Sequence, residues 1–166
     1  VERSLRVLDG VVGLFCAVGG VEPQSETVWR QADKYEVPRI CFVNKMDRVG
    51  ADYFGVVEKI KGILGANAVP ISIPIGEGPE FQGVINLVTN KAHDYDERDK
   101  GLTVRIEEVP EDMKAAADEW RMNLLEKASE QDDGLMEKYL EGQAIDADEL
   151  REVVKKATHD QKIVPV

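Results

Sequence analysis

Cysteine and long apolar runs are scarce in this sequence of 166 residues, and basic residues are outnumbered by acidic ones. Its two cysteines, Cys16 and Cys41, lie in apolar runs and lack the spacing of a metal site. We therefore expect two buried free thiols in a reducing, cytoplasmic setting, and no disulfide framework. No stretch approaches the roughly 18 apolar residues of a membrane span. The charged opening residues are also unlike a secretory signal.

Acidic residues outnumber basic ones by 32 to 21, which gives a net charge of -11. A chain with this balance is not expected to bind nucleic acid directly. An acidic surface would suit a basic protein partner, although it also maintains solubility. His93 and His159 lie far apart and have no cysteine or second histidine nearby, so we expect no metal site.

Two apolar runs, residues 11–18 and 39–43, have the near-continuous pattern of buried parallel strands. Gly19 and Gly20 allow a tight turn after the first run, and Pro23 suits the first turn of a helix. Apolar residues at helical spacing then continue to about Tyr35. The segment is therefore predicted to form one right-handed βαβ unit.

Asn44, Lys45 and Asp47 follow directly after the second predicted strand, where open α/β sheets bind their ligands. A carboxylate can accept both adjacent donors of a guanine edge, which adenine lacks, so Asp47 could distinguish the two bases. The stem of Lys45 could lie over the base, and Asn44 could brace the loop and touch the base rim. An ordinary polar loop after a strand would also fit, because N-K-x-D alone is a weak signal.

The remaining pattern predicts a helix at residues 1–9, a helix at about 52–64, and then no core strand until residues 162–166. The long interval is predicted to be an inserted subdomain. Strands are expected within 69–75, 81–88 and 102–109, with a charged turn at 94–101. Three helices are expected after Pro110, the last one opened by a capping box of Asp146 and Glu149. The predicted division is a core at 1–66, the insert at 67–158, and a final core strand at 159–166.

Several longer runs are far more specific than N-K-x-D, among them residues 17–32, 43–48, 70–76, 81–87 and 135–142. With them the whole chain closely resembles the bacterial elongation factor G family, the ribosomal translocation GTPases. The resemblance implies an α/β fold: part of a P-loop GTPase domain, with a doubly wound parallel sheet and an inserted α+β subdomain. It also implies GTP and GDP as ligands, with Asn44, Lys45 and Asp47 as the guanine contacts.

Phosphoryl transfer requires a phosphate-binding loop, G-x-x-x-x-G-K-[ST], and a magnesium ligand. The sequence contains no such motif. We therefore predict no catalytic residue and no Mg²⁺ ligand in this chain, although the family implies Mg²⁺. Because the chain also lacks an initiator Met, we expect an excised segment that is inactive alone and binds guanine nucleotide only weakly.

The resemblance further implies the ribosome as partner, with the insert as the docking surface for the ribosomal stalk protein. That surface would use the acidic side chains of the predicted insert helices, namely Glu111, Asp112, Asp118, Glu119, Glu126, Glu130, Asp132, Asp133 and Glu137. A protein-interaction module is therefore an alternative to the nucleotide function. A related ribosome-protection or release factor is a further alternative, which the 19–32 run and the length of the insert disfavour.

Overall fold

The structure is a computed structural model that describes residues 2–166. Helix α1 (Glu2–Leu5) is shorter than the helix predicted at 1–9, of which Val1 lies outside the described residues. The predicted βαβ unit follows as strand β1 (Val11–Cys16), helix α2 (Pro23–Lys34) and strand β2 (Arg39–Asn44). The two strands pair in parallel, with Val11 opposite Arg39 and Cys16 opposite Asn44.

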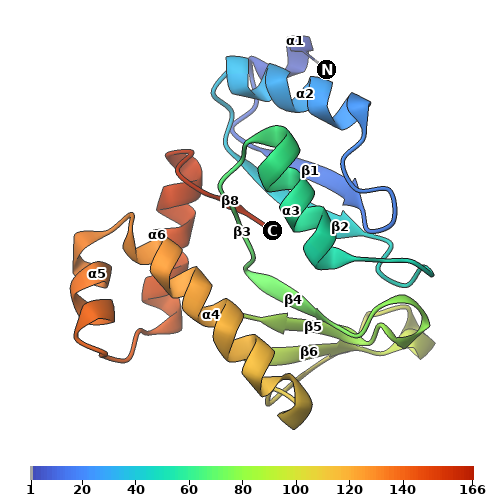
Figure 1. Cartoon of the computed structure of the whole chain (residues 1–166), viewed down its shortest axis with the longest axis vertical. Helices are drawn as coiled ribbons and strands as arrows, with labels where there is room; N and C mark the ends of the chain where they lie inside the picture. The colour runs from blue at the N-terminus through green and yellow to red at the C-terminus, as the bar shows by residue number, and fades with distance from the viewer. Residues whose placement is uncertain (1) are drawn as a thin grey trace.

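Helix α3 (Tyr53–Leu64) begins and ends as its sequence predicts. The Asp52 side chain accepts a hydrogen bond from the Gly55 N–H at 2.9 Å, and Gly65 closes the helix with a φ of 65°. This left-handed conformation carries no Cβ penalty in glycine. In Figure 1, α3 lies in front of β1 and β2, with α2 beside it.

The prediction that β1 and β2 are buried on both faces is wrong. The face carrying Phe15 packs against α2, where the Phe15 and Trp29 ring centroids are 6.2 Å apart. The opposite face is exposed, because no described helix covers it. Its apolar side chains are 43–61% exposed: Val12, Leu14, Ile40 and Phe42.

A second parallel pair joins β3 (Ala68–Val69) to β8 (Val164–Pro165), and β8 also contacts β2. A four-stranded antiparallel sheet then follows in the order β4-β5-β6-β7. Its strands are β4 (Ser72–Ile75), β5 (Gly83–Asn86), β6 (Lys91–Tyr95) and β7 (Val104–Glu107). The proline-containing β4 lies at the edge of this sheet, where the missing N–H of a proline interrupts no ladder. The sequence did not indicate β6, whose end falls within the predicted 94–101 turn.

Three helices follow this sheet: α4 (Lys114–Ser129), α5 (Asp133–Leu140) and α6 (Ala147–His159). Short 3-10 turns precede them at η1 (Gly78–Glu80), η2 (Glu97–Asp99) and η3 (Glu111–Met113). Asp146 caps α6 by accepting from the Asp148 N–H at 3.1 Å. Glu149 does not complete the predicted capping box, because its carboxylate instead binds Lys138 at 2.8 Å.

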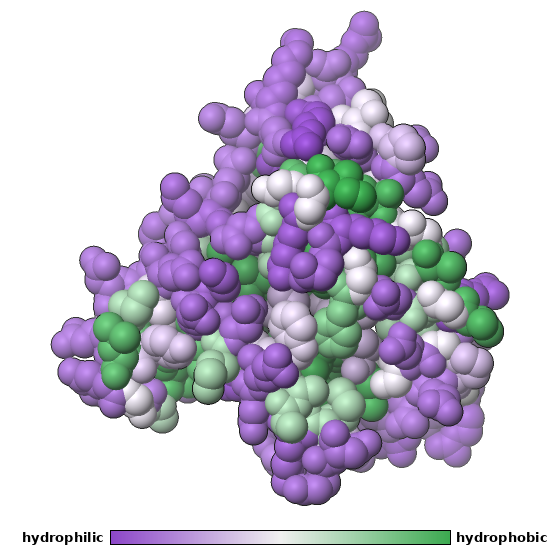
Figure 2. All heavy atoms as spheres, viewed as in Figure 1, coloured by the Kyte–Doolittle hydropathy of each residue, from purple (hydrophilic) through white to green (hydrophobic). Residues whose placement is uncertain are grey.

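One apolar core joins the parallel strands, the antiparallel sheet and the three later helices. Its fully buried members include Ile60 of α3, Ile85 of β5, Leu124 of α4 and Leu150 of α6. The face of the molecule in Figure 2 is mostly hydrophilic, in keeping with the net charge of -11. Among residues 2–166, none of the helices combines the length and apolar character needed to cross a membrane.

Candidate functional site

The residues singled out in the sequence form a loop at the carboxyl end of β2, which we call the recognition loop (residues 44–48). The strand ends at Asn44, and Lys45 then adopts a φ of 67°, which is uncommon for a residue other than glycine. A turn follows, in which the Arg48 N–H donates to the Lys45 carbonyl at 3.2 Å. The loop therefore lies at the expected strand edge, in one specific and mildly strained conformation.

Hydrogen bonds to the end of β1 hold the recognition loop in place. The Ala17 N–H donates to the Asn44 carbonyl at 2.8 Å, and the Asp52 N–H donates to the Ala17 carbonyl at 3.0 Å. The Asn44 side-chain oxygen accepts from the Lys45 N–H at 2.9 Å, so Asn44 braces the loop as predicted. The Met46 side chain is buried in the core and anchors the middle of the loop.

Asp47 directs its carboxylate away from the core, with 68% of its side chain exposed. Its ionic partner is Arg48, whose Nε lies 3.7 Å from Oδ2, and that side chain is exposed as well. A pair of this kind in solvent contributes little energy. The carboxylate of Asp47 is therefore accessible to a ligand, as is the exposed side chain of Lys45.

A cavity of about 790 Å³ opens beside the recognition loop, between β2 and the antiparallel sheet. Asn44, Lys45 and Asp47 all line it. The rest of its wall is largely apolar and aromatic, with Phe42, Tyr53, Pro74, Phe81, Val84 and Tyr95. Apolar walls with a few polar groups at one end are typical of small-molecule sites, and they suit a flat ring with a hydrogen-bonding edge.

Burial sets the ionisation of two side chains in the cavity wall. It raises the pKa of the Cys41 thiol to about 12 and raises the pKa of the Tyr53 hydroxyl well above its ordinary value. Both groups are consequently neutral at pH 7. In contrast, the N–H groups of Gly19 and Val18 lower the pKa of Cys16, which is only partly buried at the end of β1.

Sequence reasoning missed the contribution of the antiparallel sheet to this cavity. Pro74, Val84 and Tyr95 come from strands at least 27 positions after Asp47, and nothing local indicates that they face β2. The signal that could have indicated their role is the alternation along β4 and β5. One face of each strand enters the core, so the other must face solvent or a site.

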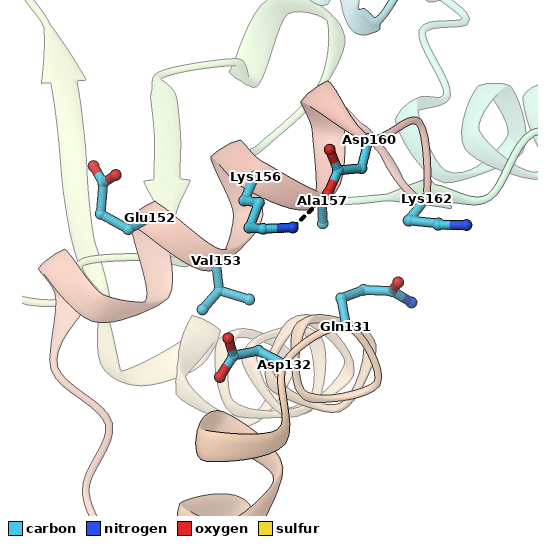
Figure 3. A pocket seen from close by; sticks show the side chains of 8 residues that line it. All are labelled: Gln131, Asp132, Glu152, Val153, Lys156, Ala157, Asp160 and Lys162. Carbon is cyan, nitrogen blue, oxygen red and sulfur yellow. Dashed lines mark hydrogen bonds and ion pairs between the residues drawn. The ribbon is translucent and has the colours of Figure 1, made fainter.

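A second cavity, of about 420 Å³, lies between α6 and the turn from α4 to α5. Figure 3 shows Gln131 and Asp132 on one side, facing Lys156 of α6 and Asp160, the residue directly after that helix. Its main polar groups already have structural partners: Lys156 binds Asp160 at 2.5 Å, and Asp132 caps α5 by accepting from the Leu135 N–H at 2.9 Å. This cavity therefore offers less available chemistry than the one beside the recognition loop.

Within residues 2–166, the structure gathers no set of three His, Cys, Asp or Glu side chains that could hold a metal ion. The recognition loop brings one carboxylate, one amide and one ammonium group to the cavity. That set can bind a base by hydrogen bonds and stacking. It does not fit a magnesium ion with its phosphates, which requires oxygen ligands in octahedral geometry and a cradle of N–H groups.

The whole chain is similar in sequence and in structure to known proteins. The model for the elongation factor Tu GTP binding domain matches residues 1–166. The chain is 55% identical to elongation factor G of Salinibacter ruber and 54% identical to that of Amoebophilus asiaticus, in each case over 100% of the chain. A crystal structure of a protein from Thermus thermophilus superposes over 99% of the chain with a TM-score of 0.84 and 30% identity.

The chain spans only part of each of these proteins. It covers 24% of the length of both elongation factors and 24% of the Thermus thermophilus chain. The comparisons therefore agree with the α/β fold over the full sequence. They also agree with the resemblance read from residues 17–32 and 43–48.

Proposed function

This chain belongs to the elongation factor Tu GTP binding domain family, and from that premise we propose that it recognises the guanine base of GTP and GDP. The proposal assigns it to a longer, elongation factor G-like GTPase that acts in ribosomal translocation. The observation that carries it is the exposed Asp47 carboxylate, placed with Asn44 and Lys45 at a cavity beside the ends of two parallel strands.

The proposed roles follow from the chemistry of each side chain. The carboxylate of Asp47 would accept hydrogen bonds from the ring N–H and the amino group of guanine, a pair of donors that adenine does not present. The stem of Lys45 would cover one face of the base. Asn44 would keep the loop in its observed shape through the 2.9 Å bond to the Lys45 N–H.

Hydrolysis is proposed for the longer protein and not for this chain alone. GTP hydrolysis depends on groups that position the phosphates and the attacking water, with Mg²⁺ neutralising developing charge when it is bound. The residues described here do not fit that role, as their carboxylates form no metal-binding set. We therefore expect weak nucleotide binding and no phosphate release from the isolated 166 residues.

A titration monitored by nuclear magnetic resonance tests the base preference. Millimolar GDP is expected to shift the amide signals of the recognition loop in the isotope-labelled chain, whereas ADP leaves them in place. Asp47→Ala should abolish the difference between the two nucleotides. Asp160→Ala is the matched control, because it removes an exposed, ion-paired carboxylate directly after α6, away from the recognition loop. Equal shifts with GDP and ADP would rule out guanine recognition.

The expected weakness of binding has a test of its own. A fluorescent GDP analogue titrated into the isolated chain should give no saturation in the micromolar range. Binding at micromolar or tighter affinity would contradict the view that contacts outside this chain supply most of the affinity.

A second candidate function is protein docking through the acidic residues of the predicted insert, 67–158. All nine of the carboxylates singled out in the sequence are at least partly exposed. Only part of their charge is balanced locally, for example where Glu130 lies 3.2 Å from Lys127. We propose that this surface attracts a basic domain of the ribosomal stalk protein. Opposite charge would mainly increase the rate of encounter.

Charge reversal separates this function from nucleotide binding. Asp118→Lys with Glu119→Lys, both on α4, should slow association with the stalk protein's terminal domain in a surface-binding assay. Asp9→Lys with Glu36→Lys changes the net charge equally, away from α4, and should have a smaller effect. Asp47→Ala should leave docking unchanged. Equal losses from both reversals would show that only net charge matters and would contradict a specific docking surface.

A further inference from the structure

A backbone contact links the antiparallel sheet to the recognition loop. The connection between β4 and β5, which we call the hairpin loop (residues 76–82), brings the Gly78 N–H to 2.8 Å from the Met46 carbonyl oxygen. The two residues are 32 positions apart in the sequence. Gly78 is buried, so its N–H has a protein acceptor at this contact instead of water.

The sequence of the hairpin loop determines its shape. Gly76 has a φ of 75°, and a Cβ there would lie 2.1 Å from the Glu80 carbonyl oxygen, so only glycine fits without a shift. The chain then turns back on itself, with Phe81 N–H bonded to the Gly78 carbonyl at 3.1 Å and Gln82 N–H to the Ile75 carbonyl at 2.9 Å. The loop is therefore compact, and it presents the Gly78 N–H to the Met46 carbonyl of the recognition loop.

The base of the same hairpin is fixed as well. The Tyr53 hydroxyl of α3 lies 2.8 Å from the Ser72 carbonyl oxygen at the start of β4. The Ile71 N–H donates to the Val166 carbonyl at 2.9 Å, beyond the end of β8. The hairpin is therefore bonded at the start of β4 to α3 and the end of the chain, and at its loop to Met46, so the hairpin loop can support the recognition loop.

The Met46 carbonyl oxygen, which accepts the bond from Gly78, is well placed to orient Asp47. The Met46 carbonyl and the Asp47 nitrogen belong to the same planar peptide unit, so fixing the carbonyl also fixes the direction in which the Asp47 backbone leaves the loop. The preceding residue, Lys45, is already held at a φ of 67°. Such a conformation persists only where its surroundings impose it.

We propose that Gly78 is a positioning residue for guanine recognition, and that its N–H holds the Met46–Asp47 peptide so that the Asp47 carboxylate faces the base. The inference rests on the proposed nucleotide function, since a positioned carboxylate matters only if it binds a base. It assigns to the antiparallel sheet a role inside the nucleotide site. That role is separate from docking by the acidic residues.

A matched pair of glycine substitutions tests the proposal. Gly78→Ala keeps the N–H but strains the backbone at a φ of 61°, and its new Cβ makes only an ordinary van der Waals contact, at 3.5 Å, with the Arg48 carbonyl oxygen of the recognition loop. Gly142→Ala imposes similar strain at a φ of 68°, with no atom within 4 Å of the new Cβ. Both variants should lose similar global stability. Only Gly78→Ala should disturb the recognition loop.

The first measurement needs no nucleotide. Hydrogen exchange at the Lys45, Arg48 and Ala51 amides reports the opening of the recognition loop, because these N–H groups bond within or beside it at 2.9, 3.2 and 3.1 Å. Gly78→Ala should accelerate their exchange by about 3- to 10-fold relative to Gly142→Ala, because relaxation of the strained residue 78 shifts its N–H and weakens the bond to the Met46 carbonyl by up to the worth of one net hydrogen bond. Equal exchange in the two variants would overturn the proposal.

The second measurement is the GDP titration of the whole 166-residue chain, monitored at the Asp47 amide. Gly78→Ala should raise the Kd for GDP by about 3- to 10-fold, and Gly142→Ala should leave it unchanged. If the unmodified chain shows no preference for GDP over ADP, the proposed function fails. If that preference holds but the two variants bind GDP equally, the positioning role alone is overturned.

A loop replacement keeps the test decisive if Gly78→Ala does not fold. Exchanging residues 76–82 for the two-residue turn Asn-Gly preserves the pairing of Ile75 with Gly83 and removes the Gly78 donor. The same increase in exchange rate is expected. The Kd is not compared for this variant, because the exchange also removes Phe81 from the cavity wall. An unchanged exchange rate in a folded loop-replacement variant would overturn the proposal.

Discussion

Phe54 and Trp120 stack face to face, with ring centroids 5.0 Å apart and planes inclined by 16°. Phe54 belongs to α3, which packs near β1 and β2, and Trp120 belongs to α4, which follows the antiparallel sheet. Within the predicted insert, Arg121 of α4 also donates a hydrogen bond to the Val88 carbonyl at 2.8 Å, which ties α4 to the antiparallel sheet. The predicted core and the predicted insert thus share a packed boundary.

The first prediction follows from this boundary. A double-mutant cycle of Phe54→Ala and Trp120→Ala should give a coupling free energy of about 0.5–1.5 kcal/mol, the usual range for a packed aromatic pair. The free energy of unfolding is measured by urea denaturation. Phe54→Ala combined with Tyr139→Ala is the control, for which we expect additive effects. Additive effects for Phe54 and Trp120 as well would mean that the stacked rings do not couple the two parts.

Local patterns predicted most of the elements that have regular periodicity and clear end signals. Asp52 and Gly65 bound α3, and Gly142 follows α5 with a φ of 68°, all as expected from capping rules. The apolar runs predicted β1 and β2, and the strand edge predicted where Asn44 and Asp47 would lie. In each case the cause is local, so one stretch of sequence is sufficient.

Features that depend on distant parts of the chain could not be predicted from one local stretch of sequence. Strand β6 has the sequence Lys-Ala-His-Asp-Tyr, with no β-branched residue, and it is a strand because β5 and β7 pair with it on either side. The exposure of Phe42 depends on which elements cover β2. The contact of Gly78 with Met46 depends on how the hairpin lies against the parallel strands. These are tertiary effects that override local propensity.

A second prediction concerns the buried guanidinium of Arg39. Its side chain is 7% exposed, it bonds to Asp33 Oδ1 at 2.6 Å, and it lies 4.6 Å from the Trp29 ring centroid. Asp33→Ala leaves this buried charge without its carboxylate. It should lower the free energy of unfolding by about 1–3 kcal/mol. Glu26→Ala removes an exposed partner of Arg30 at 3.8 Å and should cost less than about 1 kcal/mol.

Urea denaturation measures the free energy of unfolding of the two variants. Equal losses for Asp33→Ala and Glu26→Ala would show that the Arg39 guanidinium needs no carboxylate, and that the carbonyls of Val37 and Trp29 are sufficient.

A third prediction concerns the relative reactivity of the two cysteines. Burial raises the pKa of the Cys41 thiol to about 12, whereas the N–H groups of Gly19 and Val18 lower the pKa of Cys16 below its ordinary value. Because the thiolate is the nucleophile, iodoacetamide at pH 8 should modify Cys16 at least about 100-fold faster than Cys41 in the folded chain. Peptide mass spectrometry measures both rates. In urea the difference should disappear, and comparable rates in the folded chain would contradict the assigned environments.

The last prediction concerns stability in alkaline solution. The folded state keeps the Cys41 thiol neutral to a pKa of about 12, whereas an unfolded thiol ionises near its ordinary value of 9.0. The unfolded state therefore releases a proton first, so stability is complete below pH 9 and falls as the pH rises towards 12. Burial also raises the pKa of Tyr53, which adds to the loss once unfolded tyrosine begins to ionise. Urea denaturation at pH 8, 9 and 10 should show this decline.

A substitution isolates the part of the decline that belongs to Cys41. Between pH 9 and pH 10 the thiol should account for about 1 kcal/mol of lost stability, since one pH unit is worth about 1.36 kcal/mol per fully released proton. Cys41→Ala should remove that share, although the variant begins from a lower stability because a buried side chain is shortened. Cys16→Ala is the control, because Cys16 has a lowered pKa and cannot be the source of the decline. If Cys41→Ala and the unmodified chain lose stability in parallel from pH 9 to pH 10, the buried thiol is not the group that titrates.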